Sequence, residues 1–264
     1  MSTQPPRPRK RFGQHFLVQP DIARRIVDQA HLTGRERVLE IGPGRGALTT
    51  LLANGAAELW LIEIDRDLIQ LLREQFAARP EIHLIEGDVL NIDLEGLLGS
   101  AAPAIVVANL PYNVSTPVLM RLLQTPELFV RLVLMVQREV AARLAAKPGT
   151  KDYGALSVMT QLVANVRLAL SVGPAAFSPR PKVESSVVVI EPLRPAPLSA
   201  AELAAVRRVV RAAFGQRRKQ LANALSPLSP SAAETLRRIG IDPRRRAETL
   251  ATDEFVRLTR ALAI

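Results

Sequence analysis

The sequence predicts a doubly wound α/β fold, in which a largely parallel sheet is covered by helices, followed by a small helical domain. Three observations predict it. Short apolar runs alternate with longer stretches in which apolar residues recur at helical spacing. A glycine-rich turn at residues 42–46 follows the first of these runs. Three prolines within residues 192–197 then separate the strand-rich part from a tail in which helical spacing dominates.

Seven apolar runs are interpreted as strands. The first five are separated by helical patterns and are expected to lie parallel in one sheet, whereas the last two are expected to pair as an antiparallel edge. The runs are residues 38–41, 59–64, 82–85, 104–108, 132–136, 166–172 and 185–191. Beyond the prolines, a helical repeat predicts a small helical domain and consists of Leu203, Val206, Val209, Val210 and Phe214.

The first strand ends in a turn that brings backbone close to a ligand. Residues 40–46 read E-I-G-P-G-R-G and precede a helical stretch, and strand, glycine turn and helix together suit a nucleotide-like ligand. Gly42, Gly44 and Ala47 also satisfy the dinucleotide pattern G-x-G-x-x-A. Glu40, however, supplies a negative charge that suits a cationic amino acid better than a pyrophosphate. The turn therefore favours S-adenosylmethionine over a nicotinamide dinucleotide.

Acidic residues follow the next two strands. Glu63 closes the run 59–64, at a spacing of 21 residues from Gly42, where a carboxylate can accept hydrogen bonds from both ribose hydroxyls. Asp88 follows the run 82–85 and is placed to accept from the amino group of the cofactor's adenine. Either acid alone is more often a solvated loop carboxylate. Because four successive strand ends each carry a suitable group, we expect a cofactor site at this edge of the sheet.

The fourth strand end carries the most informative motif, Asn109-Leu110-Pro111-Tyr112. Pro111 has no N–H and disfavours helix at Leu110, so the chain turns at the carboxyl end of the strand. The amino group of adenine or cytosine is a poor nucleophile until it becomes tetrahedral. The side-chain carbonyl of Asn109 and the backbone carbonyl of Leu110, each accepting one amino hydrogen, favour that geometry. Tyr112 can stack on the base. The alternative is a turn that only caps the strand.

In these motifs the chain resembles the KsgA-type ribosomal RNA small-subunit adenine dimethyltransferases, and the resemblance extends over nearly its whole length. The resemblance rests on residues 10–17, 40–46, 62–65, 87–89, 109–113, 153–158, 176–183 and 214–219. It implies a Rossmann-like class I methyltransferase fold. It also implies that S-adenosylmethionine is used to dimethylate two adjacent adenosines in the 3′-terminal hairpin loop of small-subunit (16S) ribosomal RNA, in the biogenesis of that subunit.

The resemblance further implies roles for individual residues. Phe177 is expected to close the target base against Tyr112. The catalytic residues are then Asn109, Leu110, Pro111, Tyr112 and Phe177. The cofactor is expected to contact His15, Leu17, Gly42, Gly44, Glu63, Ile64, Asp88, Val89 and Asn109. RNA is expected to contact Arg217, Arg218 and Lys219. The family usually has Asn at the position of His15, where the side chain contacts the cofactor carboxylate; both residues form hydrogen bonds, but histidine can also become charged.

The composition excludes several other classes of function. The chain has no cysteine, which excludes disulfides, a cysteine nucleophile and a thiolate metal site. Its histidines, His15, His31 and His83, lack metal-ligand spacing, so no metal is expected. No apolar run approaches 18 residues and no apolar segment precedes Phe12. We therefore expect neither a membrane span nor a secretory signal, but a cytoplasmic protein, which we expect to be a monomer.

The net charge of +10 is concentrated at the two ends of the chain. Residues 1–11 hold four basic and no acidic residues, residues 200–264 hold 13 basic and six acidic residues, and the region between them is nearly neutral. This distribution suits a protein whose basic ends bind a polyanion while the nearly neutral region between them carries the catalytic site. We expect a flexible basic arm in residues 1–11, a methyltransferase domain in residues 12–192 and a helical RNA-binding domain in residues 193–264.

Three alternatives remain open at this stage. A DNA adenine methyltransferase usually has Pro at the position of Leu110 and carries a larger target-recognition domain. An erythromycin-resistance-type methyltransferase acting on large-subunit RNA has a closely related body, but Leu110 and residues 214–219 favour the small-subunit enzyme. A pure RNA-binding factor that keeps the fold without catalysis also fits, although the intact catalytic loop argues against it.

Overall fold

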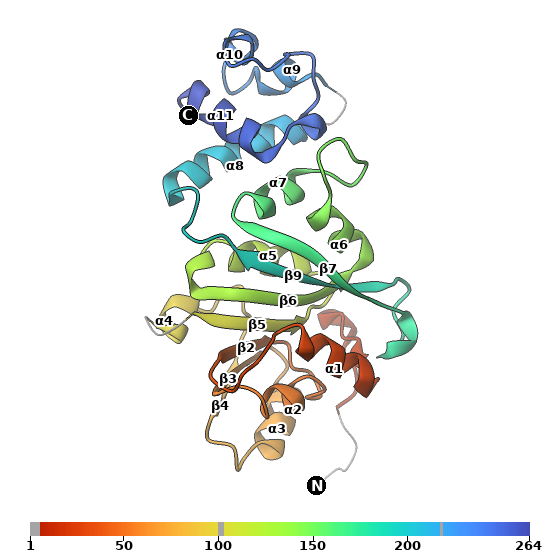
Figure 1. The fold of residues 1–264 in the computed structure, drawn as a ribbon. Helices are drawn as coiled ribbons and strands as arrows, with labels where there is room; N and C mark the ends of the chain where they lie inside the picture. The colour runs from red at the N-terminus through yellow and green to blue at the C-terminus, as the bar shows by residue number, and fades with distance from the viewer. Residues whose placement is uncertain (1–5, 100–102, 217–218) are drawn as a thin grey trace. The chain divides into compact units, whose positions relative to one another are not determined.

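The computed structural model describes residues 6–99, 103–216 and 219–264. It contains a seven-stranded sheet with the strand order β4-β3-β2-β5-β6-β9-β7 (Figure 1). Its strands are β2 (Arg37–Ile41), β3 (Glu58–Glu63), β4 (Ile82–Glu86), β5 (Ala104–Asn109), β6 (Phe129–Gln137), β7 (Ala164–Val172) and β9 (Ser185–Pro192). Strands β2 to β6 run parallel, and β9 pairs antiparallel with β6. The predicted fold class is confirmed.

The sheet is buried on both faces because its central strands are apolar at nearly every position. On one face, Val38, Leu59 and Val107 belong to a hydrophobic cluster that also contains residues of three helices. These helices are α1 (Pro20–Asp28), α2 (Thr49–Leu52) and α3 (Arg66–Gln75). Alternate residues such as Leu39 and Val106 are buried as well, as expected for parallel strands covered on both sides. Polar side chains of these strands are therefore expected mainly at the strand ends.

The parallel strands bring four loops to one edge of the sheet. In the strand order, β3, β2 and β5 are neighbours and β4 lies next to β3. The segments that follow them, residues 42–46, 64–65, 87–89 and 110–113, consequently leave the sheet at adjacent points. The connections from β4 and β5 lead into α4 (Leu94–Leu98) and α5 (Ser115–Leu122). This edge is where open α/β sheets bind ligands.

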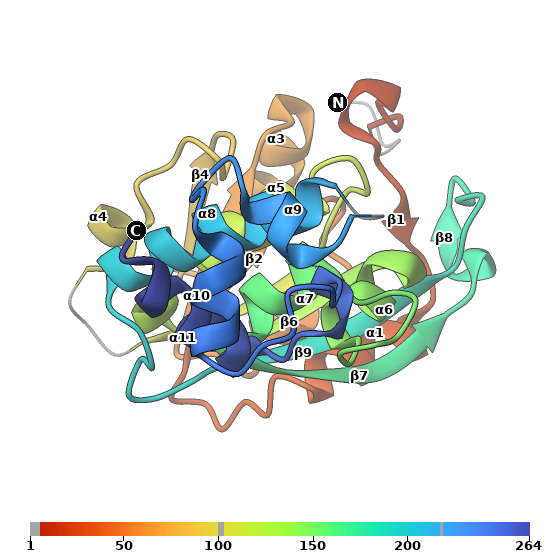
Figure 2. The ribbon, with the colours of Figure 1, turned by 90° about the horizontal axis from the view of Figure 1, so that it is seen from above.

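A second, two-stranded sheet fixes the N-terminal segment. Strand β1 (Phe16–Leu17) pairs antiparallel with β8 (Phe177–Ser178), and the two lie side by side in Figure 2. The N–H of Val18 extends the pairing by donating to the carbonyl of Ala176 at 2.8 Å. The segment before β1 contains a short 3-10 helix, η1 (Lys10–Phe12), and a second, η3 (Pro174–Ala176), precedes β8. The N-terminal segment is thereby held near the sheet edge that carries the four loops.

The contacts divide the chain into two compact units. The larger comprises Met1–Ala141 and Arg167–Pro192, and the smaller Ala142–Val166 and Leu193–Ile264. Within the smaller unit, the hydroxyl of Tyr153 donates to the Leu250 carbonyl at 2.9 Å. Residues 142–166, which we expected in the methyltransferase domain, thus associate with the C-terminal helices. The assignment of catalytic and RNA-binding roles to the two parts stays a prediction.

The remaining helices belong mainly to the smaller unit or its border. They are α6 (Arg138–Ala145), α7 (Ala155–Gln161), α8 (Ala200–Gly215), α9 (Leu221–Leu225), α10 (Ala232–Arg238) and α11 (Thr252–Leu262), with the 3-10 turn η4 (Ala247–Thr249). The 3-10 turn η2 (Pro126–Leu128) belongs to the larger unit. Ser199 caps α8 by accepting from the Glu202 N–H, while the Glu202 carboxylate accepts from the Ser199 N–H, as in a capping box. The predicted helical character of the tail is therefore present in its described part.

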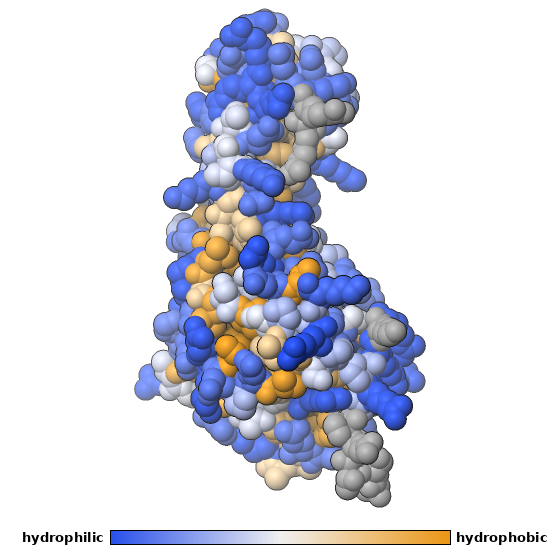
Figure 3. All heavy atoms as spheres, turned by 90° about the vertical axis from the view of Figure 1, so that its right-hand side faces the viewer, coloured by the Kyte–Doolittle hydropathy of each residue, from blue (hydrophilic) through white to orange (hydrophobic). Residues whose placement is uncertain are grey.

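The surface is polar over most of the face shown in Figure 3, and hydrophobic residues gather there at the height of the sheet. Among residues 6–99, 103–216 and 219–264, no helix is both long and apolar enough to cross a membrane. Large apolar side chains such as Val18 and Leu168 are about half exposed. Ile64 is 43% exposed and lines the pocket described below, so its side chain is available to a ligand.

Candidate active site

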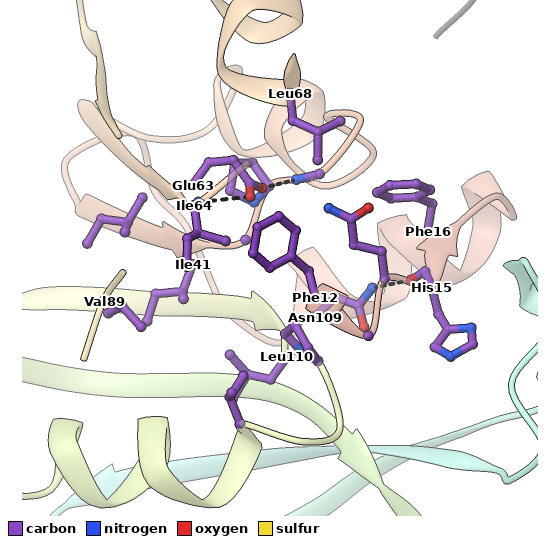
Figure 4. Close-up of a pocket in the computed structure, with 18 of the residues that line it drawn as sticks. Phe12, His15, Phe16, Ile41, Glu63, Ile64, Leu68, Val89, Asn109 and Leu110 are labelled. Carbon is purple, nitrogen blue, oxygen red and sulfur yellow. Dashed lines mark hydrogen bonds between the residues drawn. The ribbon is translucent and has the colours of Figure 1, made fainter. Parts of the chain in front are cut away.

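A pocket of about 310 Å³ lies where β2, β3, β4 and β5 end (Figure 4). Residues of the N-terminal segment also line it, so the pocket is built from five stretches of chain. The structure brings most of the sequence-predicted site residues to this pocket: His15, Leu17, Gly42, Gly44, Glu63, Ile64, Asp88, Val89, Asn109, Leu110, Pro111 and Tyr112. Their individual roles stay predictions.

The glycine turn after β2 leaves room for a ligand close to the backbone. Gly42 and Gly44 have φ angles of +67° and +60°, in the left-handed region that favours glycine. A Cβ atom on Gly44 would lie 3.1 Å from the ring of Phe16, whereas one on Gly42 would meet nothing within 4 Å. The N–H of Gly42 donates to the carbonyl of Ile62 at 2.9 Å, which fixes the turn against β3. The space beside Gly42 is consequently open to a ligand.

The carboxylate of Glu63 stands at the end of β3 and is only 4% exposed. One oxygen accepts from the N–H groups of Ile64 and Asp65, both at 2.9 Å, and the other accepts from Gly44 at 3.1 Å. Burial raises the pKa of Glu63, and these backbone donors work against that rise. A carboxylate has about four acceptor sites, so Glu63 can accept further hydrogen bonds from a ligand that enters the pocket.

Glu40 is the most deeply buried acid of the pocket, with 1% exposure. Its Oε2 atom has no hydrogen-bond partner among the described residues. Burial raises the pKa of Glu40 to about 8; the nearby hydroxyl of Thr49 opposes this rise, and the charge of Glu63 adds to it. A buried acceptor without a partner is rare and calls for an explanation. A cationic group in the pocket would supply one, in agreement with the role that the sequence indicated for Glu40.

The ends of β3 and β4 contribute apolar and acidic groups to the same pocket. Ile64 and Val89 line it with aliphatic side chains, of which Val89 is buried. Asp88 is partly buried, and its Oδ1 accepts from the N–H of Leu90 at 2.9 Å, which closes the turn after β4. This leaves its second carboxylate oxygen to face a ligand. The combination suits a flat, amino-bearing ring held between apolar side chains.

Asn109 and Leu110 present two carbonyl groups at the end of β5. The side-chain amide of Asn109 donates through Nδ2 to the backbone carbonyl of His15 at 3.1 Å, which fixes the amide and leaves Oδ1 as a free acceptor. The N–H of Leu110 donates to the Met135 carbonyl at 3.1 Å, and its side chain is buried with 1% exposure. Among the described residues, no donor reaches the Leu110 carbonyl. The two acceptors that the sequence predicted are therefore both available.

Tyr112 is held at its hydroxyl and at one face of its ring. The hydroxyl and the Oγ of Ser185 are 2.7 Å apart. The imidazole of His15 stacks on the ring, with centroids 5.5 Å apart and planes inclined by 26°. Burial raises the pKa of the Tyr112 hydroxyl, and the hydrogen bond to Ser185 opposes this. The phenol is thus neutral at physiological pH and suits stacking better than proton transfer.

The N-terminal segment contributes pocket residues to which the sequence pattern assigned no individual role. Phe12 and Gln14 line the pocket, and Figure 4 shows the Phe12 ring near its centre. Gln14 donates through Nε2 to Asp65 at 2.9 Å, and the guanidinium of Arg9 lies 3.0 Å from the same carboxylate. These contacts tie the segment to the corner after β3. Phe12 and Gln14 both lie within the motif at residues 10–17, and this motif was the feature of the sequence that pointed to the segment.

Phe177 is not brought to the pocket. Its side chain is 3% exposed, belongs to the hydrophobic cluster beneath the sheet and lies opposite Leu17 in the β1–β8 pair. Successive strand residues point to opposite sides, so Phe177 faces the core while its neighbour Ser178 is exposed. The ring that lies against Tyr112 is that of His15 instead.

The residues predicted to contact RNA are not among those that line the pocket in the described part of the chain. Lys219 is exposed, and Arg217 and Arg218 fall outside the described residues. In the part of the chain that the structure describes, no group of three or more His, Asp or Glu residues is arranged to hold a metal ion.

Comparison with known proteins gives a consistent result over nearly the full length. The family model described as "Ribosomal RNA adenine dimethylase" matches residues 6–263. Proteins named "Ribosomal RNA small subunit methyltransferase A" are similar in sequence. The one from Geobacter sulfurreducens is 47% identical over 97% of this chain and 95% of its own length. The one from Pseudomonas aeruginosa is 44% identical over 97% of this chain and 95% of its own length.

Solved structures agree with these sequence matches. A dimethyladenosine transferase from Plasmodium falciparum superposes with a TM-score of 0.81 at 25% identity, covering 92% of this chain and 96% of that one. The 23S rRNA methyltransferase ErmE superposes with a TM-score of 0.72 at 26% identity, covering 94% of this chain and all of that one.

Proposed function

Because this chain belongs to the ribosomal RNA adenine dimethylase family, we propose that it dimethylates adenosine in small-subunit ribosomal RNA with S-adenosylmethionine as the methyl donor. The targets that we propose are the two adjacent adenosines of the 3′-terminal hairpin loop, modified on a subunit that is still being assembled. We place this activity in the cytoplasm, carried out by a monomer. The observation that carries the proposal is the pair of free carbonyl acceptors on Asn109 and Leu110.

The pocket has groups that fit each part of S-adenosylmethionine. The unpartnered Oε2 of Glu40 suits the ammonium group of the methionine part, and the open space beside Gly42 admits it. Glu63 has acceptor capacity for the ribose hydroxyls. Asp88 suits the amino group of the cofactor's adenine. Ile64 and Val89, which line the same pocket, suit the apolar faces of the adenine ring. When bound, S-adenosylmethionine supplies an electrophilic methyl group on a positively charged sulfur.

The catalytic loop prepares the nucleophile. The target adenosine must leave its stack and enter the pocket, and a base in an unpaired loop costs least to extrude. Asn109 Oδ1 and the Leu110 carbonyl accept the two hydrogens of its amino group, which turns the nitrogen lone pair outward and stabilises the positive charge that builds on nitrogen. Tyr112 stacks on the ring.

The same geometry needs no general base. The methylated nitrogen is positively charged and gives up its proton readily, so no side chain has to remove a proton before attack. In the second round the amino group carries one methyl and one hydrogen, and only one of the two carbonyls receives a hydrogen bond. Orientation then depends more on stacking by Tyr112. The proposal therefore requires a site that holds the base by its ring as well as by its amino group.

The proposal is tested by offering methyl-labelled S-adenosylmethionine with undermethylated small subunits, large-subunit RNA and duplex DNA in parallel. Digestion and nucleoside mass spectrometry should find dimethyladenosine at two adjacent positions near the 3′ end of small-subunit RNA. Asn109→Ala is the matched control, since it keeps the pocket and removes one acceptor. Label confined to large-subunit RNA would assign the protein to the activity named for ErmE, and monomethyladenosine as the only product would refute dimethylation.

A further inference from the structure

His15 contacts two residues of the catalytic loop, Asn109 and Tyr112, through its backbone carbonyl and its imidazole respectively. Its backbone carbonyl accepts from Asn109 Nδ2 at 3.1 Å, which fixes the side-chain amide and leaves Oδ1 free to accept. Its imidazole covers one face of Tyr112, with ring centroids 5.5 Å apart. This separation lies in the range of favourable aromatic pairs, roughly 4.5–7 Å. A residue from the N-terminal segment thus organises a loop that lies about ninety residues later in the sequence.

The imidazole is itself held in place. Its Nδ1 lies 2.7 Å from the backbone carbonyl of Pro179. A carbonyl oxygen only accepts, so Nδ1 carries the proton and donates it. Pro179 follows β8 directly, and β8 pairs with β1 next to His15, with Phe16 opposite Ser178. The strand pairing therefore sets the position from which the imidazole reaches Tyr112.

Tyr112 lines the pocket and is only partly buried, so part of its ring is accessible to a base. Its hydroxyl is tied to Ser185 at 2.7 Å, and His15 covers the first face. The backbone before it is stiffened by Pro111. Insertion of a base between two rings requires about 7 Å between their centroids, twice a stacking distance of about 3.5 Å. The observed 5.5 Å is too short, so the base must stack on the opposite face.

We propose that His15 is a positioning residue for the target base: its imidazole braces Tyr112 so that the free face of the phenol ring is held ready for the adenine. The inference rests on the proposed function, since it names the ligand of that face. It differs from a contact between His15 and the cofactor carboxylate. Figure 4 shows the imidazole turned away from the side of the pocket that holds Glu63 and Ile64.

Two substitutions separate the stacking ring from the hydrogen bond. His15→Asn keeps a donor N–H near the position of Nδ1 and removes the ring. His15→Phe keeps a ring that can stack and removes the donor. The backbone carbonyl that orients Asn109 is present in both variants, so both leave that contact in place.

The first measurement needs no RNA. The chain has two tyrosines, so 3-fluorotyrosine labelling gives two fluorine resonances, from Tyr112 and from Tyr153 in the smaller unit. In His15→Asn the Tyr112 resonance should shift and broaden, because the phenol ring loses its brace, while the Tyr153 resonance stays in place and reports intact folding. In His15→Phe the Tyr112 resonance should remain narrow. An unchanged Tyr112 resonance in His15→Asn would overturn the proposal.

The second measurement compares methyl transfer with cofactor binding. At saturating RNA and S-adenosylmethionine, His15→Asn should lower the single-turnover rate about 2- to 12-fold, the range that a stacked aromatic pair contributes. Calorimetry should find cofactor affinity unchanged within about twofold, and His15→Phe should recover most of the lost rate.

The remaining outcomes discriminate between explanations. A loss of cofactor affinity in His15→Asn would assign the ring to the cofactor and overturn the proposal. A His15→Phe variant as slow as His15→Asn would overturn it too, because the Pro179 hydrogen bond rather than the ring would then matter. A wild-type protein that methylates no RNA refutes the proposed function, while the fluorine resonances still decide whether His15 braces Tyr112.

Discussion

Glu40 should couple cofactor binding to the release of a proton. Its carboxyl group is 1% exposed, its Oε2 has no partner among the described residues, and burial raises its pKa to about 8. In the free protein at neutral pH Glu40 is therefore largely protonated. Pairing with the ammonium group of the ligand requires the ionised form. Binding must expel the proton, and affinity should rise with pH up to about 8.

The size of the effect follows from that pKa. Each pH unit below 8 costs about 1.4 kcal/mol, or about tenfold in affinity. Between pH 5.5 and 7.5 the affinity for S-adenosylhomocysteine, which carries the same ammonium group, should rise about 100-fold. Calorimetry in buffers with different ionisation enthalpies should detect the release of close to one proton. Adenosine, which lacks the ammonium group, should show no comparable slope.

Glu40→Gln is the matched variant, because it keeps the shape and cannot ionise. Its affinity for S-adenosylhomocysteine should be low and nearly independent of pH. A wild-type affinity that varies by less than about threefold over this range would refute the reasoning, as would a Glu40→Gln variant with the wild-type slope. Either result would mean that the ammonium group does not meet Glu40.

The same pKa affects the stability of the free protein. The unfolded chain ionises Glu40 near its ordinary pKa of 4.5, whereas the folded protein keeps the proton up to about pH 8. The folded state therefore binds more protons in this window, and the contribution of Glu40 to stability falls as pH rises from 4.5 to 8, by at most about 1.4 kcal/mol per unit. Glu40→Gln lacks this loss. The melting temperature of Glu40→Gln relative to that of the wild type should therefore increase from pH 5 to pH 8. If the difference between the two melting temperatures stayed constant over this range, Glu40 would not have the raised pKa.

Three further predictions concern the other parts of the site. Asn109→Ala should lower turnover by about 10²–10³-fold, the usual cost of losing one transition-state hydrogen bond, while cofactor affinity falls less; turnover within twofold of the wild type would exclude the assigned role. Glu63→Ala should weaken binding of S-adenosylmethionine by about 1–3 kcal/mol in calorimetry, because buried ribose hydroxyls lose their partner, and an unchanged affinity would move this role elsewhere. Replacing Arg217, Arg218 and Lys219 by Ser should flatten the salt dependence of RNA binding by up to about one unit of slope per lost phosphate contact; an unaltered slope would show that they do not contact RNA.

The sequence predicted those parts of the structure that local chemistry determines. An apolar run bounded by turn residues has few alternatives to a buried strand. A few residues were therefore enough to predict β5 and the turn at Pro111. Parallel strands of one sheet end at a common edge. The residues just after each apolar run, Glu63, Asp88 and Asn109 among them, were therefore predictably gathered in one pocket.

The positions that the sequence did not predict depend on pairings between distant segments. The side to which Phe177 points is set by the pairing of β8 with β1, and a shift by one residue would have exposed it instead. The stacking of His15 on Tyr112 depends on the same pairing and on the path of the chain to Pro179. Contacts with the C-terminal helices likewise determine where residues 142–166 belong.

The pocket separates its buried acids from the neutral acceptors that we assign to methyl transfer. Its buried carboxylates, Glu40 and Glu63, lie on β2 and β3, on the side that we assign to the cationic cofactor. The catalytic loop presents only neutral acceptors, on Asn109 and Leu110. Methyl transfer from a sulfonium to a neutral amine moves a positive charge without creating a negative one. Fixed carbonyl dipoles stabilise that charge as it arrives at nitrogen and need no change of protonation, unlike a buried carboxyl group such as that of Glu40. Buried acids are thus confined to the side of the pocket that we assign to the cationic cofactor, where binding of that cofactor favours their ionised form.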